Sequence, residues 1–180
     1  MASAIAHPFA ALALAPYFRR FGIGVGLGLV GAVCTIVPDI DVLGFREGVP
    51  YASLFGHRGI THSIFFSVLL AALLTIVPRP AFPRTSAIAS FVFLFACTVS
   101  HGLLDAMTDG GLGVAFFSPF SNQRYFFPWR PICVSPLSVA QFMSGRASRV
   151  LASELHWVML PSLGLFLLGW LTRSKPVRTA

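Results

Sequence analysis

The sequence predicts an all-α fold: a polytopic membrane helical bundle of four to five transmembrane helices with an aromatic-rich interfacial loop. We expect a single integral membrane domain over residues 1–180. Composition is the first observation behind this prediction, because 56% of the residues are hydrophobic and only 11% are charged. An ordinary soluble domain has roughly 25% charged residues. The second observation is that four uncharged runs are long enough to cross a bilayer, which takes about 17–25 residues.

The four strong spans are expected at residues 21–37, 60–77, 85–104 and 155–172, and a weaker fifth at 2–18. The weaker run is not an ordinary signal peptide, because its arginines, Arg19 and Arg20, follow the apolar part. Residues 105–154 are expected to form the interfacial loop. They include the stretch FFSPFSNQRYFFPWRPICVSPLS, whose aromatic rings suit the headgroup level of a bilayer.

The charge distribution predicts which way the bundle faces. The formal net charge is +7, and in so apolar a chain basic residues mark loops and orientation rather than a nucleic-acid surface. Seven of them fall in short loops on one side: Arg19, Arg20, Arg79, Arg84, Arg173, Lys175 and Arg178. The other side has six arginines spread over longer loops. We therefore expect the short loops in the cytoplasm and the long loops in the periplasm.

The acids and histidines gather on the long-loop side. All eleven lie in its loops or at the span ends that open onto it: His7, Asp39, Asp41, Glu47, His57, His62, His101, Asp105, Asp109, Glu154 and His156. Ionisable groups in or near a membrane are costly and usually functional. Their convergence from five span ends predicts one polar site at one membrane level.

Carboxylate oxygens and imidazole nitrogens together suit zinc, iron or manganese. The PDID stretch places Asp39 and Asp41 side by side on an extended or turning backbone, and His101 and Asp105 share one helical face, four residues apart. So many candidates exceed what one ion needs. Pairs of metal ions about 3.5–4 Å apart act on phosphate esters and amides.

Other interpretations stay open at this point. Asp41 would also serve as a helix or turn cap, and His101 and Asp105 would also join two helices by a mutual hydrogen bond. Arg58 is either a group that holds phosphate or carboxylate or an interfacial anchor. Whether Glu154 and His156 join the site is open. The cysteines Cys34, Cys97 and Cys133 form no C-x-x-C pair and are interpreted as small core residues.

Four stretches, PDID, HRGITHS, HGLLDAMTDGG and FSPFSNQRYFFPWRPI, resemble the YdjM-like family of predicted membrane-bound metal-dependent hydrolases. The resemblance runs over nearly the whole chain and implies a multi-pass protein of the bacterial inner membrane with a hydrolase-like metal site. Many members have a histidine or another polar group after the second aspartate, where this chain has Val42. The positions that match the family's polar motif are His7, Asp39, Asp41, His57, Arg58, Thr61, His62, His101 and Asp105.

A looser likeness in spacing links the chain to zinc-dependent phospholipases C, in which an early histidine, an aspartate and a histidine precede a His-x-x-x-Asp helix. This likeness is analogy and does not establish function.

The sequence therefore predicts a membrane-embedded metal-dependent hydrolase. We expect one or two divalent ions, zinc before manganese or iron, to activate a water against a phosphoester or similar bond of a lipid-like or periplasmic substrate. Arg58 and Asp41 are the candidate catalytic residues. The candidate metal ligands are His7, Asp39, Asp41, His57, His62, His101 and Asp105. The expected partners are the lipid bilayer and a small-molecule or lipid-like substrate, with no nucleic acid.

Two rival functions use the same residues. A metal or proton transporter would employ the same histidines and aspartates, but transporter sites tend to lie near the bilayer midplane on broken helices. A non-catalytic membrane scaffold would use these residues only to lock helices together. The sequence leaves both rivals open, as it does the oligomeric state.

Overall fold

A computed structural model describes residues 1–77, 81–82 and 85–172 of the chain. Within these ranges the fold is helical, and the only β-type pairings are isolated bridges between Thr108 and Ile132 and between Val114 and Tyr125. The α-helices are α1 (Pro8–Phe18), α2 (Val25–Cys34), α3 (Ile64–Ile76), α4 (Ala87–Ala106), α5 (Val139–Gln141), α6 (Ala147–Glu154) and α7 (Leu160–Leu171). A 3-10 helix, Val37–Glu47, follows α2, and π-helical turns, Phe142–Arg146 and Leu155–Met159, flank α6.

The prediction of a membrane helical bundle is confirmed, but the described residues contain fewer membrane-spanning helices than the four to five expected. Three continuous helical runs are long and apolar enough to cross a membrane, Val25–Glu47, Ala87–Ala106 and Ala147–Leu171. The expected spans at 2–18 and 60–77 are shorter than predicted. The first becomes the 11-residue helix α1, which begins with Pro8 at its first position. The other becomes the 13-residue helix α3, because Ser63 caps its start by accepting a hydrogen bond from the Phe66 N–H.

Two predictions are wrong, one about where the interfacial loop ends and one about the backbone conformation at Asp39 and Asp41. The interfacial loop does not extend over all of residues 105–154, because Ala147–Glu154 is helical and continues into α7. Arg149 and Glu154 interrupt the uncharged run there, but charged residues do not prevent helix formation. Asp39 and Asp41 do not lie on extended or turning backbone either, since both belong to the 3-10 helix that prolongs α2.

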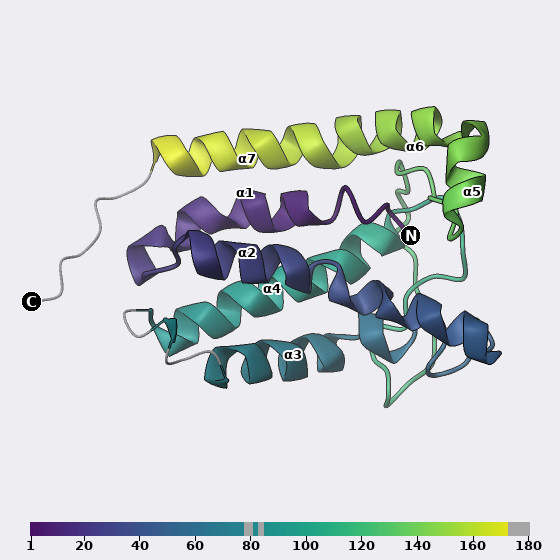
Figure 1. The fold of residues 1–180 in the computed structure, drawn as a ribbon, viewed down its shortest axis with the longest axis horizontal. Coiled ribbons are helices and arrows are strands. Elements are labelled where there is room, and N and C mark those ends of the chain that lie inside the picture. Colours follow the sequence, from purple (N-terminus) through teal and green to yellow (C-terminus); the bar gives the residue numbers. More distant parts are fainter. Residues whose placement is uncertain (78–80, 83–84, 173–180) are drawn as a thin grey trace, which may run out of the picture.

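The helices lie roughly alongside one another, and the connections collect at two ends (Figure 1). One end, called the site end below, holds residues 1–7, the 3-10 helix Val37–Glu47, the connection to α3, and residues 107–146. The opposite end holds the turn between α1 and α2 and the end of α7. Among the basic residues expected at that opposite end, Arg79, Arg84, Arg173, Lys175 and Arg178 lie outside the described residues.

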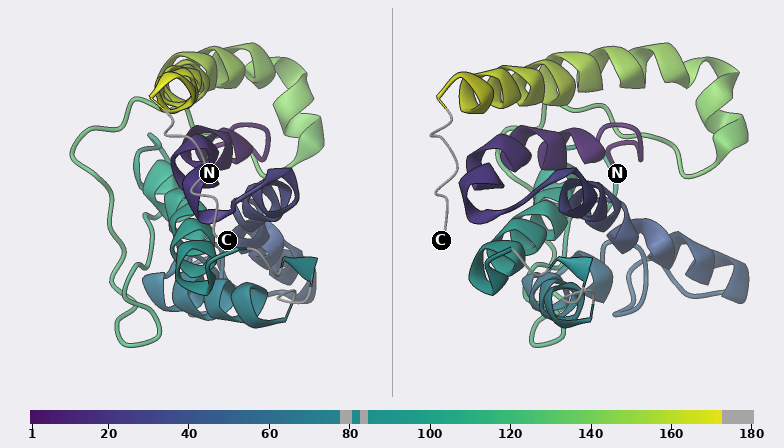
Figure 2. Two further views of the ribbon diagram at one scale, coloured as in Figure 1. Left: turned by 90° about the vertical axis from the view of Figure 1, so that its left-hand side faces the viewer. Right: turned by 60° about the vertical axis from the view of Figure 1, so that its left-hand side comes forward.

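Helix α4 is the centre of the bundle. It packs against α1, α2 and α3, while α1 also packs against α7 (Figure 2). Close approach of α2 to α4 depends on Gly31, where a Cβ atom would lie 2.6 Å from the ring of Phe93. Cys34 and Cys97 are buried, free thiols within this core, as predicted. The packing fixes α4, and with it the side chains near its C-terminal end.

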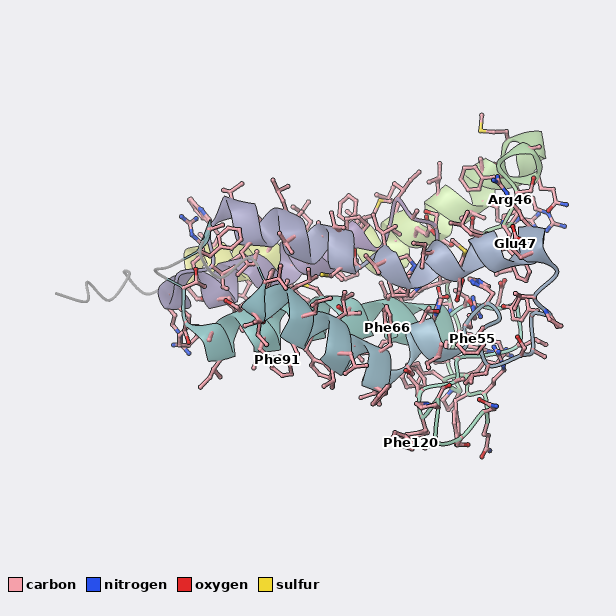
Figure 3. The ribbon with its side chains drawn as sticks, turned by 60° about the horizontal axis from the view of Figure 1, so that its bottom comes forward. Arg46, Glu47, Phe55, Phe66, Phe91 and Phe120 are labelled. Carbon is pink, nitrogen blue, oxygen red and sulfur yellow. The ribbon has the colours of Figure 1, made fainter. Side chains whose placement is uncertain are left out.

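The outside of the bundle is apolar along the helices and aromatic at the site end. Val25 and Leu29 of α2 and Leu168 of α7 are exposed, as expected for helices that face lipid. Figure 3 shows Arg46 and Glu47 near the extremity of the site end. It also shows Phe120 at the tip of the loop formed by residues 107–138, called the long loop below. The Phe120 side chain is 83% exposed. Phe117 and Trp129 are also exposed, so the loop presents several aromatic side chains on the surface of the site end.

Candidate metal centre

Four polar side chains from three parts of the fold meet at the site end. Asp39 comes from the 3-10 helix after α2, His62 from the 3-10 turn before α3, and His101 and Asp105 from the last turns of α4. One potential ligand atom of each lies within 4.8 Å of those of the other three. His62, His101 and Asp105 are buried. These four residues are called the ligand group below.

Local structure explains why these side chains meet. His101 and Asp105 are four residues apart in α4, so they lie on one face, about one turn from each other. His62 is held just before the N-cap of α3, and the backbone N–H of Ile64 donates to the carbonyl of Phe116 in the long loop. The carbonyl of His62 is also close to α4, since a Cβ atom at Gly102 would lie 3.0 Å from it.

Hydrogen bonds orient both imidazole rings. Nδ1 of His101 lies 2.7 Å from the carbonyl oxygen of Thr35, and a carbonyl only accepts, so this nitrogen carries the hydrogen. Nδ1 of His62 lies 3.1 Å from the Thr61 hydroxyl, which donates its own hydrogen to Asp41, and 3.2 Å from Oδ2 of Asp41, so this nitrogen carries the hydrogen as well. Each Nε2 atom is then left with a lone pair, and the two Nε2 atoms are 2.9 Å apart. Such a pair requires a positive charge beside it, either a proton or a metal ion.

The carboxylates surround the same point. Oδ1 of Asp39 lies 3.3 Å from Nε2 of His101 and 3.6 Å from Nε2 of His62. Oδ2 of Asp105 lies 3.6 Å from Nε2 of His62 and 3.9 Å from Nε2 of His101. A tetrahedral ion with bonds of about 2.0–2.1 Å has ligand atoms about 3.3–3.4 Å apart. The separations bracket that value, so the group fits a zinc-sized ion.

Buried atoms without partners point to the same conclusion. Both carboxylate oxygens of Asp39 are buried and accept no protein hydrogen bond, and the buried Oδ2 of Asp105 accepts none either, although the Arg58 guanidinium forms an ion pair with it. Most buried polar atoms in folded proteins are satisfied. A cation at the centre of the ligand group would satisfy the oxygens and separate the two imidazole lone pairs.

Asp41 is the hub of a second, adjacent group. Oδ1 lies 2.8 Å from Nδ1 of His57, while Oδ2 accepts hydrogen bonds from the Thr61 hydroxyl at 2.7 Å and the Arg58 N–H at 3.2 Å. Asp41, His57 and His62 also lie within 4.8 Å of one another by one ligand atom each. Burial lowers the pKa of His57, and the Asp41 carboxylate offsets only part of that effect. Nε2 of His57 has no partner.

Arg58 is fully buried and points at Asp105. Its Nε lies 3.0 Å from Oδ2 of Asp105, and its two terminal nitrogens donate to the Gly110 carbonyl and the Thr108 hydroxyl, both at 2.9 Å. The backbone of Arg58 has φ +62°, a left-handed conformation that costs a non-glycine residue about 1–2 kcal/mol. Gly111 makes room for the guanidinium, since a Cβ atom there would lie 2.8 Å from it.

Sequence comparison gives the context of this geometry. The chain matches the family described as "YdjM inner membrane protein" over residues 1–176. It belongs to the YdjM family. It is 39% identical over 158 residues to "Inner membrane protein YbcI" of Escherichia coli (strain K12), which covers 83% of this chain and 90% of the relative. No solved structure matches the chain significantly. The family match confirms the resemblance seen in the sequence motifs, and with it an inner-membrane protein.

In this YdjM-family protein His7 lies beside the ligand group rather than in it. Its ring stacks on that of His101 with centroids 3.9 Å apart, and its Nε2 lies 3.6 Å from Oδ1 of Asp105. Both ring nitrogens of His7 are buried without hydrogen-bond partners. The structure thus brings all seven predicted ligands to one end of the bundle, but His7, Asp41 and His57 stand outside the four that share a centre.

The sequence left Glu154 and His156 open, and the structure separates them. His156 is exposed and stacks edge-on against Trp157. Glu154 is buried and accepts hydrogen bonds from the backbone N–H and the hydroxyl of Ser3. The neighbouring N–H of Ala2 donates to Oδ1 of Asp105 at 2.7 Å. The sequence gives no sign of the backbone groups that contact the site, which are the N–H groups of Ala2 and Ser3 and the carbonyl of Thr35, because any residue type supplies them.

Proposed function

We propose that the protein is a membrane-embedded hydrolase that depends on a divalent metal ion, zinc before manganese or iron, bound by Asp39, His62, His101 and Asp105. The observation that carries the proposal is the pair of Nε2 atoms held 2.9 Å apart beside the buried Asp39 carboxylate, whose two oxygens accept no protein hydrogen bond. Simple helix locking needs neither feature, because it is satisfied by complementary donors and acceptors.

The second group acts on the first through hydrogen bonds. Asp41 faces the Nδ1 atoms of both His57 and His62 and also accepts from Thr61, so its oxygens are occupied. We therefore assign Asp41 as a positioning residue that fixes the tautomer of His62. This arrangement favours one ion per chain over two.

Arg58 is assigned a positioning role as well. Its guanidinium is committed to Asp105, Gly110 and Thr108, so it holds the Asp105 carboxylate toward the centre. His57 presents an unpartnered Nε2 and a neutral ring favoured by burial. That nitrogen is placed to accept a proton during hydrolysis.

Because these four side chains would fill a tetrahedral site, a water would have to bind as a fifth ligand; a divalent ion would lower the pKa of that water to about 7 and polarise the bond under attack. The substrate that fits best is a phosphoester in a lipid headgroup or a periplasmic molecule, because the ligand group lies at helix ends beneath an aromatic, interfacial loop.

Phosphoester hydrolysis tests the proposal. Detergent-purified protein loaded with Zn²⁺ is expected to release phosphate or alcohol from at least one of p-nitrophenyl phosphate, bis-p-nitrophenyl phosphate and phosphatidic acid. Chelation should abolish the reaction, and the His101→Ala variant should be inactive. The His156→Ala variant should retain activity because His156 is exposed and outside the site. A zinc-loaded, folded protein that cleaves none of the three would contradict the assignment as a phosphoesterase.

The site end is proposed to face the periplasm, on the basis of the basic residues predicted in the short loops. A single cysteine at Asn122, in an otherwise cysteine-free protein, is expected to react in intact cells with a membrane-impermeant thiol reagent. A cysteine at Thr172, at the opposite end, should react only after lysis. The reverse labelling pattern would place the site in the cytoplasm and remove periplasmic substrates from consideration.

A further inference from the structure

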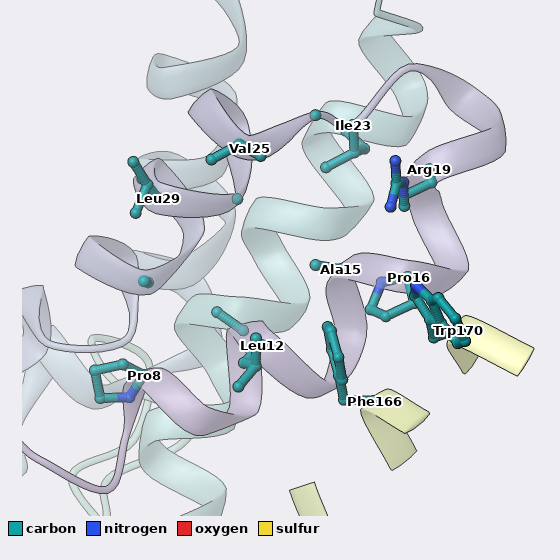
Figure 4. A pocket seen from close by; sticks show the side chains of 14 residues that line it. Pro8, Leu12, Ala15, Pro16, Arg19, Ile23, Val25, Leu29, Phe166 and Trp170 are labelled. Carbon is teal, nitrogen blue, oxygen red and sulfur yellow. The ribbon is translucent and has the colours of Figure 1, made fainter. Parts of the chain in front are cut away.

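A long apolar groove runs along the outside of the bundle, away from the ligand group. Helix α1, together with Arg19 just after its end, forms the floor of the groove, α2 forms one wall, and Phe166 and Trp170 of α7 form the other (Figure 4). The cavity has a volume of about 350 Å³. Its lining is apolar except at one end, where Arg19 lies.

Small residues on α2 keep the groove open. A Cβ atom added at Gly24 or Gly28 would meet no other atom within 4 Å, and both glycines line the groove. On the face of α2 toward α4, a Cβ at Gly31 would lie 2.6 Å from Phe93. The glycines of α2 therefore serve two purposes. Gly31 permits close helix packing, whereas Gly24 and Gly28 leave space that the protein itself does not fill.

The dimensions of the groove match one leaflet of a bilayer. The floor from Pro8 to Arg19 covers eleven residue steps, about 16 Å at the helical rise of about 1.5 Å per residue. Half of the hydrocarbon core is about 15 Å. Val25, which is 82% exposed, and Leu29 form the lip of the α2 wall. An acyl chain would lie in this groove over its whole length.

Charge identifies the headgroup. Arg19 closes the groove at the opposite end of the bundle from the ligand group, and no ion pair among the described residues involves it. All six acidic residues of the chain lie at the site end: Asp39, Asp41, Glu47, Asp105, Asp109 and Glu154. A guanidinium at an interface, with no ion-pair partner among the described residues, is suited to a lipid phosphate.

We propose that this groove binds one anionic phospholipid from the leaflet at the opposite end of the bundle. Its acyl chain lies along α1 between α2 and α7, and its phosphate pairs with Arg19. The site is separate from the ligand group, so it does not depend on the proposed hydrolase function.

Native mass spectrometry of the protein in a neutral detergent tests the proposal, with phosphatidylglycerol and diacylglycerol of identical acyl chains as probes, because diacylglycerol lacks the phosphate. Wild type is expected to bind phosphatidylglycerol about tenfold more tightly, because a charge-assisted contact is added. Gly28→Phe should weaken both lipids by about tenfold or more by filling the groove. Arg19→Gln should lower phosphatidylglycerol binding to the diacylglycerol level and leave diacylglycerol binding unchanged.

Matched controls separate this site from general lipid contact. Gly164→Phe places the same ring on α7 outside the groove. A Cβ atom at Gly164 also meets no other atom within 4 Å, so this variant should bind both lipids like wild type. Arg20→Gln removes the same charge one residue away and should change binding less than about twofold. Equal loss in Arg19→Gln and Arg20→Gln, or wild-type binding by folded Gly28→Phe, would overturn the proposal. If Gly28→Phe does not fold, the two arginine variants decide.

Discussion

Replacing His101 with alanine is expected to lower the Zn²⁺ affinity of the purified protein by more than about 100-fold while the bundle stays folded. Loss of an outer partner of a metal ligand already costs about 10–100-fold, and His101 is a direct ligand in our assignment. The alanine removes one Nε2 lone pair and leaves no buried charge behind. Zinc titration against a competing chelator measures the affinity, and thermal unfolding in detergent monitors the fold.

His156→Ala is the matched control, because it removes an exposed histidine from another helix and should leave zinc affinity unchanged. Unaltered affinity in folded His101→Ala would show that His101 is not a ligand. Unfolding of His101→Ala, with no zinc binding by wild type, would favour the scaffold function, in which the polar residues only lock helices together. A transporter would also bind the ion, but it would not hydrolyse the phosphoesters tested above.

The Asp105→Ala variant is expected to be destabilised by about 3–5 kcal/mol, even without metal, because it leaves the buried guanidinium of Arg58 without its carboxylate. The N–H of Ala2 loses its acceptor as well. Unfolding of metal-free protein in a detergent titration measures the effect. Zinc binding should be lost in the same variant.

The double variant Arg58→Met, Asp105→Leu separates stability from metal binding. Replacement of a buried ion pair by apolar residues of similar size is often neutral or stabilising, so the double variant should recover most of the lost stability. It should still fail to bind zinc. If Asp105→Ala is as stable as wild type, or if the double variant is no more stable than Asp105→Ala, the pair is not the buried charge contact described here.

Sequence patterns predicted the parts of the site that depend on local spacing. His101 and Asp105 share a helix face because they are four residues apart, and that holds in any helix. The segregation of acids and histidines to one end also followed from span order alone. The same reasoning predicted buried, unpaired Cys34 and Cys97.

Tertiary contacts decided what the sequence left open. Asp39 and Asp41 were both candidate ligands from the sequence, with Asp41 also a candidate catalytic residue. The 3-10 helix after α2 places Asp39 in the ligand group, while Asp41 accepts from His57, Arg58 and Thr61. Those donors are 16 to 20 residues away in sequence. The role of Arg58 likewise depends on the left-handed backbone at Arg58 and on the space at Gly111, neither of which a hydropathy pattern reports.

Helix boundaries were missed where charge was taken as the end of a span. The segment Ala147–Glu154 contains Arg149 and Glu154 yet continues into α7. Burial explains how the acid is tolerated, because Glu154 is covered and accepts two hydrogen bonds from Ser3. A search for uncharged runs finds the part of a helix that can face lipid. It misses a part that carries charged residues because those residues face protein.

X-ray absorption spectroscopy at the zinc edge, on zinc-loaded protein in detergent, tests the central claim most directly. One ion per chain is expected, with four nitrogen or oxygen neighbours from the protein and up to one water oxygen at about 2.0–2.2 Å, and with the outer-shell scattering of two imidazoles, from His62 and His101. A sulfur neighbour at about 2.3 Å, a spectrum without imidazole scattering, or a protein that retains no zinc would contradict it.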